Sequence, residues 1–415
     1  MSLAVTAAIA DPDLLFFPWE TPLEEWPEDL IVALPRGISR HIVRFIKIHG
    51  VVHALKEIEE SFAKREYDLL LELQRRSIPA VEAVAVVSGR KDKHDEPLPA
   101  ILITRHLDFS LPYRAVFSST PRPDTASRLL DAMTALFVRL HSVGFSWNDC
   151  SLSNTLFRRD AGAFAAYLVD AETGELHHHL SDGQRQYDID TAILNVTGEL
   201  LDLEYGGKLP ESVDPIQLGA SLGLRYQKLW DLLNKPVILE YGNRNELDNH
   251  IRSLNDIGFD VSGISMQSID ADRQLVRVQA KVVDVGHHAR RLLRLTGLDV
   301  EENQARRLLN DLDSFKATSA SSLSEEEVAH RWMLVIYEPV IDQIPKEFRK
   351  KLEPAEIFHE VLEHRWFMSE RIGHSIPLNE VVDDYIINVL SNKPDEAAII
   401  SIDDTTEITQ SSKPN

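Results

Sequence analysis

The chain has 415 residues, enough for two or three domains and for a sizeable buried core. Hydrophobic residues make up 43% and charged residues 27%, a composition that excludes a disordered or fibrous chain. The formal net charge of −22 argues against broad nucleic-acid binding and against a polybasic membrane surface. No apolar run reaches the roughly eighteen residues that a membrane span needs, so we predict no integral membrane segment.

Two further features bear on the compartment. No Lys or Arg precedes Arg36, whereas a secretory signal begins with basic residues. Cys150 is the one cysteine, so the chain forms no intrachain disulfide, as is typical of a reducing compartment. We therefore expect a cytoplasmic protein.

Residues 1–35 form an acidic arm that carries four large aromatic side chains: Phe16, Phe17, Trp19 and Trp26. Large apolar side chains are costly to leave in water. We expect this arm to dock on the body of the protein, with a partner-binding peptide as the alternative.

Residues 36–107 predict a β-β-α-β-β order. Hydrophobic patterning and breakers place two strands joined at Gly50, a helix and two further strands, over 42–48, 51–58, 59–76, 81–87 and 100–104. The helix has an apolar stripe of Phe62, Leu70 and Leu73 that also contains Glu66. A carboxylate on an apolar face needs a cation, so Glu66 should pair with a buried Lys or Arg. A helix inserted into an antiparallel sheet indicates the α+β class.

The rest of the chain is mainly helical. Helices are predicted over 125–141, 189–203 and 217–233, with short strands at 155–157 and 165–169. From 236 a hairpin of 263–269 with 274–283 precedes helices at 290–296, 301–315, 324–340, 354–372 and 378–390. We therefore predict a second, mainly helical α+β domain over 236–391, followed by a mobile, disordered tail over 392–415.

The residues that point to chemistry lie around a loop after the helix of 125–141. Asp149 is followed five positions later by Asn154, and the apolar strand Tyr167-Leu168-Val169 leads to Asp170. Phosphoryl transfer uses such groups. One carboxylate orients and deprotonates an acceptor hydroxyl, while an amide oxygen and a second carboxylate hold Mg²⁺.

The pattern Asp149-x-x-x-x-Asn154, a strand and then Asp170 resembles the catalytic loop and metal-binding aspartate of the protein-kinase-like fold. With Leu140-His141-x-x-Gly144 before it and Cys150 beside Asp149, it is similar to the lipopolysaccharide kinase (Kdo/WaaP) family of bacterial proteins. This resemblance covers roughly residues 36–235. Residues 236–390 resemble the domain of unknown function DUF4032, which accompanies such kinase-like regions in some bacterial proteins.

The resemblance implies a two-lobed kinase-like fold, with an N-lobe and hinge over 36–107 and a C-lobe over 108–235. It also implies ATP and Mg²⁺ as cofactors. Asp149 would be the base or acceptor-orienting group, and Asn154 and Asp170 would hold the metal. Ala54-Leu55-Lys56 resembles the strand whose lysine contacts the nucleotide phosphates, with Lys47 on the preceding strand as the competing lysine. Glu66 is the expected partner of Lys56.

Further nucleotide-binding residues follow from the same resemblance. Thr104 to Leu107 would be the hinge, so that Arg105 and His106 border the adenine. The Gly-rich segment is reduced to Leu34–Arg40, where Arg36, Gly37, Ser39 and Arg40 would contact phosphates. Asp188 or Asp190, at the start of the helix of 189–203, would brace the catalytic loop.

The chain also departs from the family pattern. Trp147-Asn148-Asp149 replaces His-Arg-Asp or His-Gly-Asp, and Trp147 cannot accept a hydrogen bond as His does. Asp170 is followed by Ala171-Glu172, and no Ala-Pro-Glu segment is present.

Our first hypothesis is a kinase acting on a hydroxyl of a sugar, a glycan-lipid or another small molecule, with a protein acceptor left open. The alternatives are an inactive pseudokinase serving as a nucleotide-sensing or interaction module, and a nucleotidyltransferase. The C-terminal domain is a candidate surface for a protein partner.

Several residues of reactive types receive ordinary structural interpretations. We expect Cys150 to be a buried, unreactive thiol and His141 a helix-end histidine with a satisfied hydrogen bond. Three adjacent histidines at 177–179 cannot all face one ion, so they are interpreted as a solvated loop. The basic run from His287 to Arg294, with Arg306 and Arg307, is interpreted as a solvated helix face.

Overall fold

The computed structural model describes residues 3–9, 11–32, 41–119, 124–235, 237–240, 249, 259–270, 275–319 and 323–397. Arg36, Gly37, Ser39 and Arg40 lie outside the described residues. Of the tail predicted over 392–415, residues 398–415 also lie outside them, whereas residues 392–397 are described and Glu396 is buried. The chain divides into two compact units. The first contains the described residues of Met1–Arg158 and Ala166–Leu224, and the second those of Arg159–Ala165 and Arg225–Ala397.

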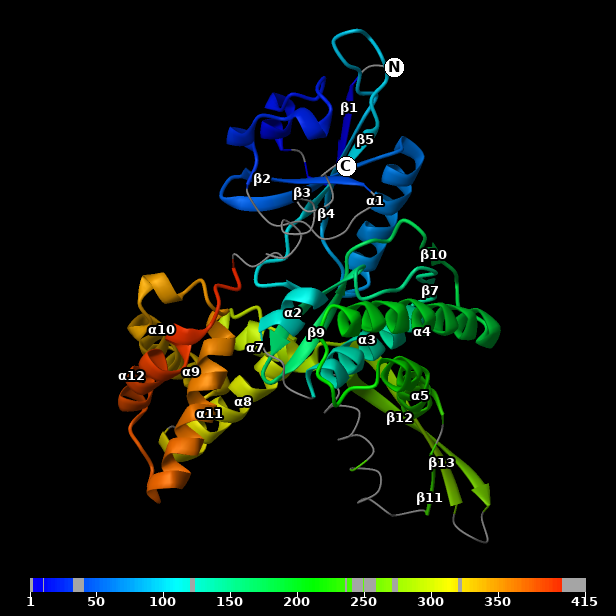
Figure 1. Cartoon of the computed structure of the whole chain (residues 1–415). Helices are drawn as coiled ribbons and strands as arrows, with labels where there is room; N and C mark the ends of the chain where they lie inside the picture. Colours follow the sequence, from blue (N-terminus) through cyan, green and yellow to red (C-terminus); the bar gives the residue numbers. More distant parts are fainter. Residues whose placement is uncertain are drawn as a thin grey trace. The chain divides into compact units, whose positions relative to one another are not determined.

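The first unit begins with a five-stranded antiparallel sheet of order β1-β4-β5-β3-β2. Its strands are β1 (Ala4–Ala7), β2 (Ile42–Ile48), β3 (Val51–Ile58), β4 (Ala83–Ser88) and β5 (Ala100–Arg105). Helix α1 (Glu60–Arg75) follows β3 and packs against β4 and β5 (Figure 1). The predicted β-β-α-β-β order is confirmed. Strand β1 was missed, because it is a four-residue edge strand without a buried residue and so carries little local signal.

The predicted stripe of α1 is correct except at Phe62. Leu70, Leu73 and Glu66 are buried, whereas Phe62 is 42% exposed. Ala63 and Tyr67 complete the buried face, so Ala63 occupies the place that was predicted for Phe62.

The N-terminal arm docks on the sheet. Trp19 and Trp26 are buried in a cluster with Ile46 of β2 and Leu55 of β3. The buried guanidinium of Arg90 donates to the carbonyl of Trp19 over 3.0 Å, and also donates to Glu57, Pro99 and Thr21. The expectation of docking is confirmed for the two tryptophans and is wrong for Phe16, which is 84% exposed.

The helical part of the first unit contains α2 (Tyr113–Ser119), α3 (Thr125–Ser142) and α4 (Asp182–Tyr205), while α5 (Pro215–Asn234) continues into the second unit. Short strands lie between them: β6 (Leu111–Pro112), β7 (Phe145–Ser146), β8 (Thr155–Asp160), β9 (Ala163–Leu168) and β10 (Glu175–Leu176). Helix α4 starts seven residues before the predicted start at Ile189, because Ser181 and Gln184 form a capping box. Asp188 and Asp190 therefore lie inside α4, and the prediction that one of them opens the helix was wrong.

The second unit combines a three-stranded sheet with helices. Strands β11 (Val237–Glu240), β13 (Leu275–Val285) and β12 (Phe259–Asp270) lie in that order, and β12 pairs antiparallel with β13, as predicted for the hairpin. The helices are α7 (His287–Thr296), α8 (Glu302–Ser319), α9 (Glu325–Trp332), α10 (Glu338–Gln343), α11 (Pro354–Ile372) and α12 (Leu378–Asn388). A π-helical turn over Met333–Tyr337 interrupts the helix predicted for 324–340.

The tip of the β8–β9 hairpin is packed within the second unit. Asp160 is buried and accepts hydrogen bonds from the Gln304 backbone and the Asn303 amide, both over 2.8 Å. Arg159 pairs with Glu396 at 2.7 Å. Burial raises the pKa of Asp160 to about 8. The sequence carries no sign of this arrangement, because the partners lie over 140 residues apart.

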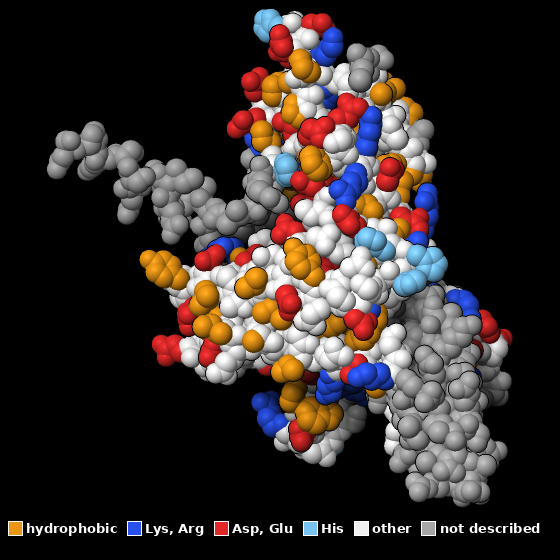
Figure 2. Space-filling model, turned by 90° about the vertical axis from the view of Figure 1, so that its right-hand side faces the viewer, with side chains coloured by type: hydrophobic (Ala, Val, Ile, Leu, Met, Phe, Trp, Pro, Cys, Tyr) orange, Lys and Arg blue, Asp and Glu red, His pale blue; other side chains and the backbone are white. Residues whose placement is uncertain are grey.

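The described residues contain no helix long and apolar enough to cross a membrane. On the face seen in Figure 2, acidic and basic side chains of the described residues are intermingled and form no broad basic area.

Candidate active site

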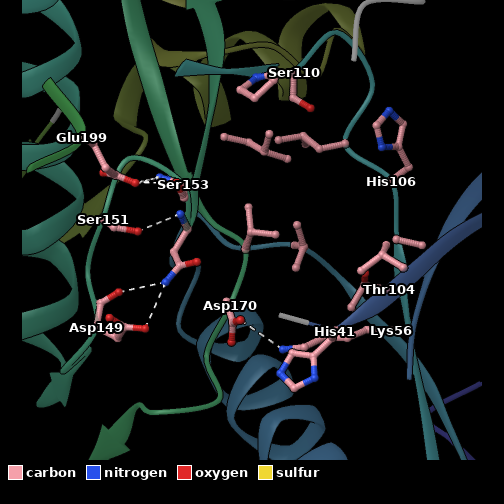
Figure 3. Close-up of a pocket in the computed structure, with 18 of the residues that line it drawn as sticks. His41, Lys56, Thr104, His106, Ser110, Asp149, Ser151, Ser153, Asp170 and Glu199 are labelled. Carbon is pink, nitrogen blue, oxygen red and sulfur yellow. Dashed lines mark hydrogen bonds and ion pairs between the residues drawn. The ribbon is translucent and has the colours of Figure 1, made fainter. Parts of the chain in front are cut away.

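A cavity of about 720 Å³ lies in the first unit, bordered by β2, β3, the segment after β5, the loops beside β8 and β9, and α4 (Figure 3). Its lining includes most of the residues singled out from the sequence: Lys56, Arg105, His106, Asp149, Asn154 and Asp170. Glu66 contacts Lys56 at its edge. Residues from six separate elements thus meet around one space large enough for a small ligand.

Lys56 and Glu66 form the predicted pair. Lys56 is on β3, opposite Val43 of β2 and Leu102 of β5, and its Nζ lies 3.0 Å from Glu66 Oε2. Burial raises the pKa of Glu66 to about 7 although Lys56 opposes this, and the Ala171 N–H donates to Glu66 Oε1 over 3.3 Å. Lys47 is exposed, so the competing assignment is wrong.

The ammonium group of Lys56 has two more carboxylate partners. Its Nζ lies 3.1 Å from Asp170 Oδ2 and 3.2 Å from Glu172 Oε2. Burial lowers the pKa of Lys56, but the carboxylates of Glu66 and Asp170 outweigh it, and the pKa is raised overall. Glu172 also lies 3.0 Å from His41 Nε2. Neither Glu172 nor His41 was singled out as functional from the sequence.

The loop that carries Asp149 is held by two amide side chains. Asn154 Nδ2 donates to the Asp149 carbonyl over 2.9 Å and makes a longer contact, 3.4 Å, with Asp149 Oδ2 (Figure 3). From α4, Asn195 Nδ2 donates to the Cys150 carbonyl over 3.0 Å and lies 3.4 Å from Asp149 Oδ1. The Asp149 carboxylate therefore faces the cavity in a set orientation.

Asp188 is the residue that braces this loop. It is fully buried and accepts hydrogen bonds from the backbone N–H groups of Trp147 and Asn148, each over 2.7 Å. Its carboxylate also lies 3.0 Å from His141 Nε2. These contacts stabilise Asn148 at a φ of 65°. Asp190 is exposed and bonds to Gln186, so the choice between the two aspartates falls on Asp188.

Replacing Asp188 with alanine should destabilise the protein by about 2–5 kcal/mol, because two buried N–H groups lose their acceptor. Urea unfolding measures this loss. Asp190→Ala on the same helix is the control and should change stability by no more than about 0.5 kcal/mol. Equal effects of the two substitutions would contradict the assignment.

Trp147 links the loop of Asp149 to the loop of Asp170 by donating a hydrogen bond, whereas the His expected at this position would accept one. It accepts no hydrogen bond through its ring, but its indole Nε1–H donates to the Asp170 carbonyl over 2.9 Å. The Thr173 hydroxyl donates to the Trp147 carbonyl over 2.9 Å. The indole is buried against Phe137, with ring centroids 5.9 Å apart.

Helix α4 supplies a second clamp that the sequence analysis missed. Glu199 accepts hydrogen bonds from the N–H groups of Leu152 and Ser153, over 2.6 and 2.9 Å, and from the Ser153 hydroxyl. Asp188, Asn195 and Glu199 are spaced seven and four residues apart, so they share one helix face. This spacing could have indicated a shared role for the three residues. Because the helix was predicted to start at Ile189, Asp188 was not recognised as part of it.

At the hinge, the backbone N–H groups of Arg105 and His106 are already bonded, to the carbonyls of Glu82 and Val52. A contribution of these two residues to base binding would therefore come from carbonyl oxygens or side chains. His106 also lies edge-on to Phe45, with ring centroids 5.6 Å apart, and burial lowers its pKa.

The structural interpretations of the other reactive residues agree with the structure. Cys150 is buried, and burial raises the pKa of its thiol well above the ordinary value. His178 and His179 are exposed, and His177 Nε2 lies 3.4 Å from Glu175 Oε2. In the basic run of the second unit, Arg291 pairs with Glu325 and His288 with Glu302.

Comparison with known families agrees with the geometry. Residues 36–192 match the model of the Lipopolysaccharide kinase (Kdo/WaaP) family, and residues 228–390 match Domain of unknown function (DUF4032). One similar solved structure is "WaaP in complex with acyl carrier protein", at 17% identity and a TM-score of 0.33, covering 55% of this chain and 100% of that chain. No curated protein matches the chain.

These matches confirm the resemblance drawn from the sequence, a kinase-like region followed by a DUF4032-type domain. They also agree with the observed order of an N-terminal sheet with α1 followed by a mainly helical part, and thus confirm the predicted fold class.

Proposed function

We propose that this protein is an ATP- and Mg²⁺-dependent phosphotransferase that phosphorylates a hydroxyl group of a sugar, a glycan-lipid or another small molecule. The observation that carries the proposal is that Lys56, Asp149, Asn154 and Asp170 line one cavity, with Glu66 paired to Lys56. The match of residues 36–192 to a kinase family supports it.

Lys56 would hold the α- and β-phosphates of the nucleotide, as the corresponding lysine does in kinase-like folds. Glu66 fixes the position of Lys56 from the buried side, where it is 1% exposed. This pairing keeps the ammonium charged in a partly desolvated place.

Asn154 and Asp170 fit a magnesium site by the chemistry of their donors. Mg²⁺ prefers oxygen ligands from carboxylates and amides. The amide nitrogen of Asn154 donates to Asp149, which leaves the amide oxygen as the atom for a cation. The bound ion would neutralise charge on the transferred phosphoryl group.

Asp149 would orient the acceptor hydroxyl and accept its proton. The contacts from Asn154 and Asn195 hold its carboxylate in place before a substrate arrives. The cavity beside it is lined by groups that hydrogen-bond hydroxyls: Ser151, Ser153, Asn195, Glu199 and Asp202. This polar lining suits a polyhydroxylated acceptor.

Thermal unfolding with ATP and MgCl₂, compared with ATP and EDTA, tests the proposal. A metal-dependent stabilisation is expected, of about 2.7 kcal/mol when the ligand is at 100 times its Kd. No stabilisation under either condition would contradict the proposal and support the pseudokinase alternative.

The substitution Trp147→Phe should lower the affinity of the ATP-bound protein for Mg²⁺, although the aromatic ring stays buried. Loss of the Nε1–H bond frees the Asp170 carbonyl, and loss of such a supporting contact typically costs about 10–100-fold in metal affinity. The measurement is a titration of Mg²⁺ in the presence of ATP.

Trp332→Phe is the matched control, since that buried indole donates to Asp311 over 2.8 Å in the second unit. Its Mg²⁺ titration should equal that of the wild type. The same shift in both variants would contradict a specific role for Trp147.

A further inference from the structure

Lys56 uses its full hydrogen-bonding capacity on carboxylates. A lysine ammonium has three N–H donors. The carboxylates of Glu66, Asp170 and Glu172 lie 3.0, 3.1 and 3.2 Å from its Nζ. A phosphate oxygen can therefore bind Lys56 only after one of these carboxylates has moved away.

Glu172 is the carboxylate best able to leave. Glu66 is 1% exposed and is also held by the Ala171 N–H. Asp170 accepts a backbone hydrogen bond from Glu172 over 3.0 Å, which fixes its carboxylate within the loop. The Glu172 carboxylate is held by two side chains, Lys56 and His41, whereas the other two carboxylates each accept a backbone N–H as well.

The position of Glu172 resembles that of a bound anion. The same oxygen, Oε2, lies 3.2 Å from Lys56 Nζ and 3.0 Å from His41 Nε2. Both nitrogen-bearing side chains line the cavity, and His41 directly precedes β2 (Figure 3). A phosphate oxygen can bridge a lysine and a histidine in the same way.

We propose that Lys56 and His41 together form a phosphate-binding site for the nucleotide, and that the Glu172 carboxylate occupies this site until the nucleotide displaces it. His41 is then a second phosphate-binding residue, and Glu172 competes with the triphosphate. The inference rests on the proposed function and adds to it which residues bind the triphosphate.

The substitution Glu172→Gln tests this competition. A neutral amide holds Lys56 and His41 less strongly than a carboxylate does, so the triphosphate should displace it more easily. We expect ATP and inorganic tripolyphosphate, both in EDTA, to bind the variant about tenfold more tightly than the wild type. Isothermal titration calorimetry on the full chain measures both affinities.

Two further variants make the test specific. His41→Ala should weaken binding of both ligands, and adding it to Glu172→Gln should remove much of the gain. Glu175→Gln is the matched control, because Glu175 is an exposed carboxylate three residues further along that is not among the cavity-lining residues. Its affinities should equal those of the wild type.

Unchanged or weaker binding by Glu172→Gln overturns the inference. The inference is also overturned if Glu172→Gln changes only the Mg²⁺ dependence of ATP binding, because Glu172 would then be a metal ligand. If Lys56→Met abolishes Mg²⁺-ATP binding while the His41 and Glu172 variants behave as wild type, only this inference fails. If neither wild type nor any variant binds ATP, the proposed function fails with it.

Discussion

Replacing Asp149 with asparagine is expected to lower phosphoryl transfer from ATP by about 10²–10⁴-fold, the usual contribution of a positioned general base. The amide is similar in shape, and its single oxygen can still accept the contact from either Asn154 or Asn195, but it cannot take the proton of the acceptor. ATP binding should stay close to that of the wild type, because the phosphate contacts assigned to Lys56 remain.

The rate can be followed as ADP release, with water as the acceptor until the natural one is known. Asp190→Asn is a suitable control, since Asp190 is an exposed acid of α4 that is not among the cavity-lining residues. This variant should release ADP at a rate within about twofold of the wild-type rate. An Asp149→Asn protein as fast as the wild type would remove the catalytic role of Asp149.

Replacing Lys56 with methionine is expected to abolish nucleotide binding and to lower the free energy of unfolding by about 3–5 kcal/mol, because it leaves buried Glu66 without its cation. The loss should depend on pH. The pKa of Glu66 in the folded protein is about 7 even with Lys56 present, against an ordinary value of 4.5. Without Lys56 it should move higher still.

A raised pKa in the folded state means that the stabilising proton is bound at low pH and is lost as the pH rises through that value. The Lys56→Met protein should therefore be most destabilised near pH 8 and less so near pH 5, where Glu66 is protonated. Urea unfolding at both pH values measures this. Lys47→Met, an exposed lysine on β2, is the control and should change stability little at either pH. A loss of stability in Lys56→Met that does not depend on pH would contradict a buried ion pair between Lys56 and Glu66.

Features with local signals were predictable. The alternation of β2 and β3, the helical spacing in α1 and α3, and the strand before Asp170 led to the correct element order. Glu66 could be paired with Lys56 because a carboxylate on an apolar stripe requires a cation, and the structure places them 3.0 Å apart.

Features that depend on distant contacts were not predictable in this way. Glu172 follows Asp170 by two positions, but its significance comes from His41, 131 residues earlier in the chain. The spacing of Glu199 from Asp188 and Asn195 places them on one helix face, but that Glu199 binds the backbone of Leu152 and Ser153 depends on a contact between α4 and a distant loop. The packing of the β8–β9 tip within the second unit likewise joins residues that no local pattern connects.

The net charge of −22 raised the question of where an anionic nucleotide would find positive charge. In the part of the chain that the structure describes, the basic side chains of the cavity come from the residue before β2, from β3 and from the hinge: His41, Lys56, Arg105 and His106. The acids of the cavity come from the catalytic loop, the loop after β9 and α4: Asp149, Asp170, Glu199 and Asp202. Under the proposed function, the basic groups would serve the phosphates and the acidic groups the metal and the acceptor, and the two sets meet where Lys56 contacts Asp170.

Mass spectrometry of the nucleotide released from ATP in the presence of Mg²⁺ tests the central claim most directly. We predict ADP from the wild type, with one phosphoryl group transferred, and almost none from Asp149→Asn or Asp170→Asn. Release of AMP would indicate nucleotidyl transfer instead, and equal ADP from all three proteins would contradict phosphoryl transfer at this site.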